Sequence, residues 1–154
     1  MSESNEQREC VSSVGNLPLA IAWAVLVAIG GGYLCGLAIS RFGEFGSIAL
    51  WPLGAVAGYV GRKIIGQPNR GVAWMLVAAC VIAFLLAEVC WIRWCWPFWG
   101  EGEGSWSEAV MLLPTFLQKY QMTVLIAAVF TFFGALAAYR QTAVRYRWVR
   151  VEER

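Results

Sequence analysis

Long uncharged stretches of apolar residues set what this chain can fold into. Residues 17–40, 47–61 and 123–139 carry no charge, and residues 71–92 carry only Glu88. A helix needs about 20 apolar residues to cross the hydrocarbon core of a bilayer. The first and third stretches reach that length, and the other two reach it with their flanking residues. A soluble helical protein is a poor alternative, because helices that are apolar on every side have no polar face for water.

The sequence therefore predicts an all-α fold, an integral membrane four-helix bundle with an amphipathic interfacial helix at its outer face. The membrane domain, residues 17–140, is expected to hold four spans, at residues 17–40, 47–65, 71–94 and 121–140. A long outer loop, residues 95–120, is expected between the third and fourth spans. Residues 1–16 are polar and are expected to be a disordered cytoplasmic N-terminus. Residues 141–154 are expected to form a basic cytoplasmic tail.

Local signals refine the helix ends. Ser47 is expected to cap the second span, and Pro52 then falls in its second turn, where it would bend the helix. In the outer loop, Ser105 and Glu108 fit the S-x-x-E capping box. An apolar stripe follows at helical spacing and predicts the amphipathic helix, with Pro114 as a possible break: Trp106, Val110, Leu113 and Leu117.

The distribution of Lys and Arg predicts the orientation in the membrane, because basic residues concentrate in cytoplasmic loops. With four spans, both termini and the second loop share one side, which holds nine basic residues: Arg8, Arg62, Lys63, Arg70, Arg140, Arg145, Arg147, Arg150 and Arg154. The other side holds three: Arg41, Arg93 and Lys119. The sequence therefore predicts a multi-pass protein of the inner (plasma) membrane, with both termini in the cytoplasm.

Every fourth residue of the first span is small: Ala20, Ala24, Ala28, Gly32, Gly36 and Ser40. Helices in lipid associate through close van der Waals contact, which small residues permit. The expected partner is the second span, so that Gly32 and Gly36 lie against Gly54 and Gly58, with Gly61 extending the same stripe. The third and fourth spans carry similar stripes. Four stripes can close a bundle within one chain, and a surplus stripe can make a homo-oligomer; both remain open.

Glu88 is the only acidic side chain inside a predicted span, and such a residue is by default a functional hypothesis. It has two possible roles. It is either a site for a proton or a cation, or the partner of Arg41 or Arg93 in an ion pair that holds the outer ends of two helices together. Its depth near the outer face favours the ion pair.

Tryptophans crowd the outer end of the third span: Trp91, Trp94, Trp96 and Trp99. Trp prefers the membrane–water boundary, where its ring contacts lipid and its N–H meets water. The expectation is an interfacial belt. The alternative is a stacking platform for a lipid head group or a quinone ring.

Little in the sequence points to catalysis, a metal or a cofactor, because the chain lacks His, Asp and any C-x-x-C pair. A disulfide between Cys90 and Cys95 stays open. The first functional hypothesis is a non-enzymatic membrane protein that packs into or supports a larger assembly in the lipid bilayer, with a membrane-protein partner or a second copy and no nucleic acid. The alternatives are a small transporter or channel subunit that uses Glu88, and a lipid or quinone binder at the tryptophan belt.

Two segments, GAVAGYVGRKIIGQPNRG and FGALAAYR, pair a glycine-striped helix and a basic turn with the end of the last span. With the outer amphipathic segment, they resemble small bacterial four-span membrane proteins that carry no assigned activity. The resemblance covers residues 30–140 and implies an integral inner-membrane protein. The Trp-rich outer loop departs from that pattern.

Overall fold

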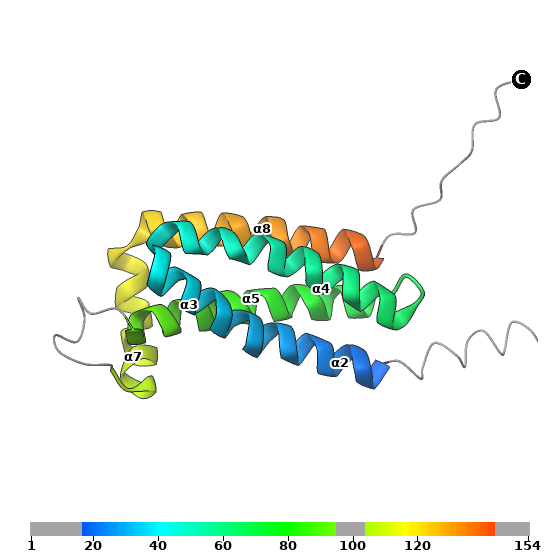
Figure 1. Cartoon of the computed structure of the whole chain (residues 1–154), viewed down its shortest axis with the longest axis horizontal. Coiled ribbons are helices and arrows are strands. Elements are labelled where there is room, and N and C mark those ends of the chain that lie inside the picture. Colours follow the sequence, from blue (N-terminus) through cyan, green and yellow to red (C-terminus); the bar gives the residue numbers. More distant parts are fainter. Residues whose placement is uncertain (1–16, 95–103, 144–154) are drawn as a thin grey trace, which may run out of the picture.

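The computed structural model describes residues 17–94 and 104–143, and all regular secondary structure in these residues is helical (Figure 1). Three helical stretches in it are long and apolar enough to cross a membrane: Leu17–Ile65, Arg70–Trp94 and Gln121–Ala143. The all-α prediction is therefore confirmed, and the helices are those of a membrane-embedded protein.

The first stretch is helical throughout but reverses its direction. It comprises α2 (Leu17–Leu26), the π-helical turn η1 (Val27–Gly31), α3 (Gly32–Phe42), the 3₁₀ segment η2 (Gly43–Ala49) and α4 (Leu50–Ile65). Figure 1 shows the chain turning at η2, so that α4 runs back alongside α2 and α3. The turn is tight because Gly46 has no side chain, and a Cβ there would overlap the backbone of Ala38.

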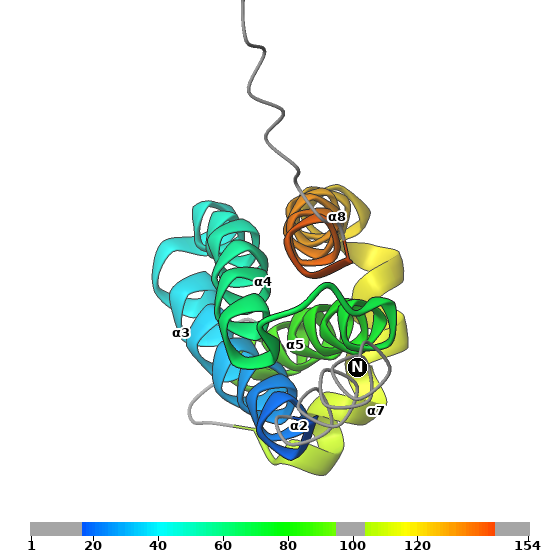
Figure 2. The ribbon, with the colours of Figure 1, turned by 90° about the vertical axis from the view of Figure 1, so that its right-hand side faces the viewer.

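The second half of the chain adds α5 (Arg70–Trp94), α7 (Trp106–Lys119) and α8 (Gln121–Ala143). Helix α5 contacts α3, α4, α7 and α8, and the view along the helices in Figure 2 shows it below α8, with α3 and α4 to its left. Helix α7 lies across one end of the long helices (Figure 1). The end that carries α7 is called the α7 end below, and the opposite end is called the basic end, because its described charged residues are Arg62, Lys63, Arg70 and Arg140.

The small-residue stripe of the first span is buried except at the half-buried Ser40, but the prediction that Gly32 and Gly36 pack on the second span is wrong. Helix α3 packs on α5: a Cβ at Gly32 would lie 2.8 Å from the carbonyl oxygen of Ala83, and a Cβ at Gly36 would lie 3.1 Å from that of Ala87. The contact between α2 and α4 uses a large side chain instead. Nε1 of Trp23 donates a hydrogen bond to the carbonyl oxygen of Ala57, at a distance of 3.1 Å. A small-residue stripe permits close approach but does not specify the partner.

Helix α4 uses its own stripe against α8. A Cβ at Gly54 would overlap the backbone of Gly134, and one at Gly58 would lie 2.6 Å from Cα of Ala138. The two backbones therefore touch, with no side chain between them at Gly54. Both helices have a glycine at this contact, since a Cβ on Gly134 would in turn lie 2.7 Å from the carbonyl oxygen of Leu50.

Two helix starts differ from the sequence prediction. Ser47 lies within η2, where its hydroxyl donates to the carbonyl oxygen of Glu44, and α4 begins only at Leu50. Pro52 thus falls in the first turn of α4 and not in the second. In the first turn its missing N–H costs no intrahelical hydrogen bond. Pro114 lies inside α7, which nevertheless runs without a break.

The start of α7 is as predicted, and two residues of its predicted apolar stripe, Leu113 and Leu117, pack on α5. Ser105 and Glu108 form the reciprocal capping box, with the Ser105 amide donating to the Glu108 carboxylate over 3.1 Å. The buried residues of α7 are Ala109 and Phe116, whereas Val110, which the sequence placed on the apolar face, is 56% exposed. Ala109 and Phe116 pack against Val89 and Ile92 of α5, and the adjoining part of the predicted stripe is only partly buried in this contact.

Candidate functional site

Glu88 lies in the last third of α5, and only 1% of its surface is exposed. Residues four positions apart share one face of a helix, so Glu88 stands between Phe84 and Ile92. Phe84 packs against an apolar cluster from α3, α4, α5 and α8, and Ile92 packs against Ala109 and Phe116 of α7. The carboxyl group therefore sits where two apolar clusters meet.

Neither carboxylate oxygen of Glu88 has a hydrogen-bond partner among the residues that the structure describes. The predicted pairing with Arg41 or Arg93 is thus not formed as a hydrogen-bonded pair. Arg93 contacts the α7 region instead. Its Nε donates a hydrogen bond to the carbonyl oxygen of Gly104 at a distance of 3.2 Å, and its guanidinium lies 4.2 Å from the ring centre of Trp106. Arg41 is exposed at the end of α3. The cation–π contact with Trp106 and the hydrogen bond to Gly104 both join the end of α5 to the start of α7.

The other charged groups at the α7 end also have contacts of their own. Glu44 of η2 accepts a hydrogen bond from the buried hydroxyl of Thr123 over 2.8 Å. Lys119 lies 5.7 Å from the ring centre of Tyr120. Hydrogen bonds from the Ser105 hydroxyl and amide lower the pKa of Glu108. These contacts leave Glu88 as a carboxyl group without a described counter-ion at hydrogen-bond distance.

An ionised carboxylate in such a place is expensive, because burying an unpaired charge costs several kcal/mol. Two arrangements avoid that cost. Glu88 is either protonated and neutral, or its charge is balanced by a cation that binds beside it. The carboxyl group is thus neutralised by a proton in the first arrangement and by a bound cation in the second.

The tryptophans of the predicted belt that the structure describes pack against the chain's own aromatic rings. Trp91 meets Phe116 edge to face, with ring centres 5.0 Å apart. Trp94 meets Tyr33 of α3 in the same way at 5.2 Å. Both are partly buried. Trp96 and Trp99 lie outside the described residues.

The small residues expected to form the helix contacts, Ala28, Gly32, Gly36, Gly54, Gly58 and Gly61, are all buried. Ala28 is 7% exposed, and Gly32, Gly36, Gly54 and Gly58 make the backbone contacts described above. A Cβ on Gly61 would lie 2.6 Å from a methyl group of Leu76 on α5. Each stripe faces another helix of the same chain.

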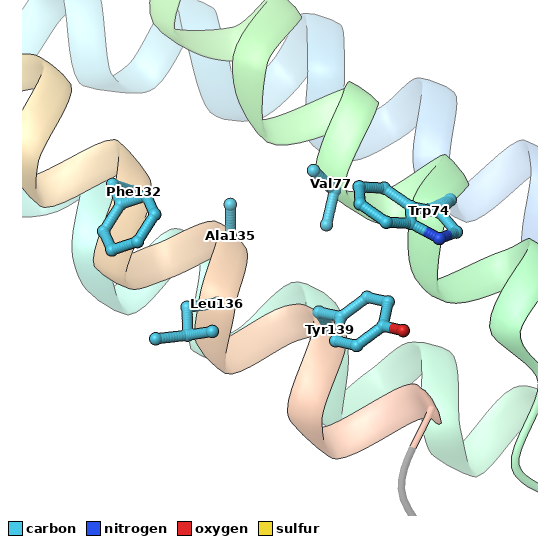
Figure 3. A pocket seen from close by; sticks show the side chains of 6 residues that line it. All are labelled: Trp74, Val77, Phe132, Ala135, Leu136 and Tyr139. Atoms are coloured by element: carbon cyan, nitrogen blue, oxygen red, sulfur yellow. The ribbon is translucent and has the colours of Figure 1, made fainter.

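A feature that sequence reasoning missed is a groove between α5 and α8 near the basic end, with a volume of about 330 Å³ (Figure 3). Six side chains line it: Trp74, Val77, Phe132, Ala135, Leu136 and Tyr139. Trp74 and Tyr139 lie 5.3 Å apart between ring centres, at an angle of 58°. The available signal was the position of one aromatic residue near the basic end of each of two spans.

No cluster of three or more metal-ligating side chains occurs within residues 17–94 and 104–143. The thiols of Cys35, Cys80 and Cys90 are free, and Cys95 lies outside the described residues. No family model, curated protein or solved structure matches the chain.

Proposed function

We propose that the chain is a four-pass protein of the inner membrane with both termini in the cytoplasm, and that it takes up a proton or a small cation at Glu88, as a small transporter or channel subunit does. In this proposal α2 with α3, α4, α5 and α8 are the four spans of a bundle, and α7 lies at the outer face. The observation that carries the functional part is the burial of the Glu88 carboxyl group without a hydrogen-bond partner among the described residues. No enzymatic step is involved.

Two other hypotheses have less support. A scaffold that packs into an assembly rests on the continuous small-residue stripes and on the lack of a catalytic constellation in the sequence. The described stripes on all four spans are buried within the chain, including Ala83 and Ala135. A lipid or quinone platform at the tryptophan belt needs free ring faces, whereas Trp91 and Trp94 contact neighbouring rings.

The proposed orientation predicts where reporter enzymes are active. A reporter that works only outside the cytoplasm is expected to be inactive when fused after Arg154 and active when inserted at Gly102. The physical reason is the nine-to-three division of Lys and Arg between the two sides. Activity at Arg154 would contradict the four-pass arrangement with a cytoplasmic N-terminus.

The proposed role of Glu88 predicts reaction with a hydrophobic carbodiimide, which adds to protonated carboxyl groups in apolar surroundings to give a stable N-acylurea. In membranes that contain the full chain, we expect mass spectrometry to find the adduct on Glu88 and not on exposed Glu108. Labelling is expected to fall as the pH rises, because the carbodiimide consumes the protonated form. A cation that binds beside the carboxylate is expected to slow labelling.

Glu88→Gln is the matched control, because the amide keeps the shape of the side chain and cannot react. Reconstituted into vesicles, the unmodified chain is expected to dissipate an imposed proton or cation gradient, and Glu88→Gln is expected to abolish that flux. An unlabelled Glu88 in a folded chain, or equal flux in both proteins, would refute the functional proposal and leave the topology intact.

A further inference from the structure

The groove between α5 and α8 has the character of a lipid site rather than of a gap in the packing. Its lining is apolar, and it opens on the outer surface of the helices, where Trp74 is 62% and Phe132 63% exposed. From Phe132 to Tyr139 it follows two turns of α8, which is about 10 Å at 1.5 Å per residue. Figure 3 shows Trp74 of α5 and Tyr139 of α8 side by side at one end of it.

Two arginines extend the walls of this groove toward the basic end. Arg70 lies four residues before Trp74, and Arg140 lies four residues after Leu136, so each shares a helix face with a residue of the lining. Both arginines are exposed. Residues 59–87 and 124–143 contain no Asp or Glu, so the two guanidinium groups meet no acidic residue of these segments.

We propose that the groove binds one chain of an anionic phospholipid, whose phosphate is held by Arg70 and Arg140. The order of chemistry along the groove matches that of a lipid: apolar side chains for the acyl chain, then two rings of the kind that prefer the membrane boundary, then two cations. Each basic residue near an anionic lipid adds favourable electrostatic free energy to its binding. Two such residues therefore favour an anionic over a zwitterionic head group. The proposal is independent of the role of Glu88.

Lipid binding can be counted directly by native mass spectrometry of the full-length chain, purified in detergent and freed of lipid. The probes are phosphatidylglycerol and phosphatidylcholine with identical acyl chains. We expect one phosphatidylglycerol to bind more tightly than phosphatidylcholine. The double variant Arg70→Gln with Arg140→Gln is expected to weaken phosphatidylglycerol binding by on the order of tenfold or more and to leave phosphatidylcholine binding unchanged.

The matched control is the double variant Arg41→Gln with Lys119→Gln, which removes the same charge at the α7 end and is expected to leave the preference intact. Leu136→Trp fills the groove and is expected to weaken both lipids. Equal affinity for the two lipids, or equal losses in both double variants, would overturn the proposal. A third result would also overturn it. If analytical ultracentrifugation shows a dimer that Leu136→Trp converts to a monomer, and the amount of bound lipid stays unchanged, then a second copy of the chain covers the groove.

Discussion

Gly54→Ala is expected to destabilise the protein by about 1–3 kcal/mol or more, although it adds a single methyl group. Gly54 faces the backbone of Gly134 with no side chain between them, and a Cβ there would overlap main-chain atoms of α8. Main-chain atoms cannot rotate away as a flexible side chain can, so α4 and α8 must move apart. Their separation loses dispersion contacts along the whole interface, as in an overpacked core.

Gly30→Ala is the matched control for this experiment, because a Cβ at Gly30 would have Leu26 as its neighbour at 3.7 Å, an ordinary contact distance. The same methyl group is therefore accommodated, and Ala has a better helix propensity than Gly by up to about 1 kcal/mol. We expect the midpoint of thermal aggregation in one detergent to fall for Gly54→Ala and to stay level or rise for Gly30→Ala. Equal midpoints would mean that the backbones of α4 and α8 do not touch.

Glu88→Met is expected to have the opposite effect on stability and to raise the free energy of unfolding by about 1–3 kcal/mol. Met has a similar length, and it replaces a buried carboxyl group that has no described hydrogen-bond partner by a thioether that suits the apolar surroundings. Under the proposed function, the stabilised variant carries no flux. A gain in stability with a loss of function is the trade-off expected of a residue that is kept for its chemistry.

Glu44→Met tests whether that gain is specific to the buried site. Glu44 is exposed and accepts the hydrogen bond of the buried Thr123 hydroxyl, so its removal leaves that donor unsatisfied and is expected to lower stability. The two variants make the same chemical change with opposite predicted signs in the same thermal assay. A loss in Glu88→Met as large as that in Glu44→Met would show that Glu88 has a stabilising partner.

The long helices could be predicted because their ends are marked locally. Arg70–Trp94 and Gln121–Ala143 begin within one residue of their expected positions. Gly66, with a left-handed φ of 73°, ends the helix before α5, and the Asn69 side chain accepts a hydrogen bond from the Val72 amide at the start of α5. The partners of the helices could not be predicted in this way. Gly36 meets α5 and Gly54 meets α8, but the two residues have the same chemistry and either helix can accept either stripe.

The environment of Glu88 was beyond the sequence for a related reason. Arg41 and Arg93 lie near the same end of the helices as Glu88, but the sequence does not show which way their side chains turn. The rotation of Arg93 toward Trp106 depends on where α7 comes to lie, and that is set by contacts such as Phe116 with Trp91. The charges around Glu88 thus depend on tertiary contacts of α7, which the local sequence pattern does not reveal.

The π-helical turn at Val27–Gly31 has a consequence for the phase of the first span. In a regular α-helix each residue advances by 100°, so a stripe at every fourth residue drifts by about 40° per step and Ala20 would stand about 160° away from Gly36. A π turn accommodates about one extra residue, which reduces that difference to about 60°. Ala20 and Gly36 are both buried, and both of their helical segments contact α5. The single π-helical turn thus rotates α3 relative to α2, so that small residues spaced four apart in both segments can point toward the same side of the bundle.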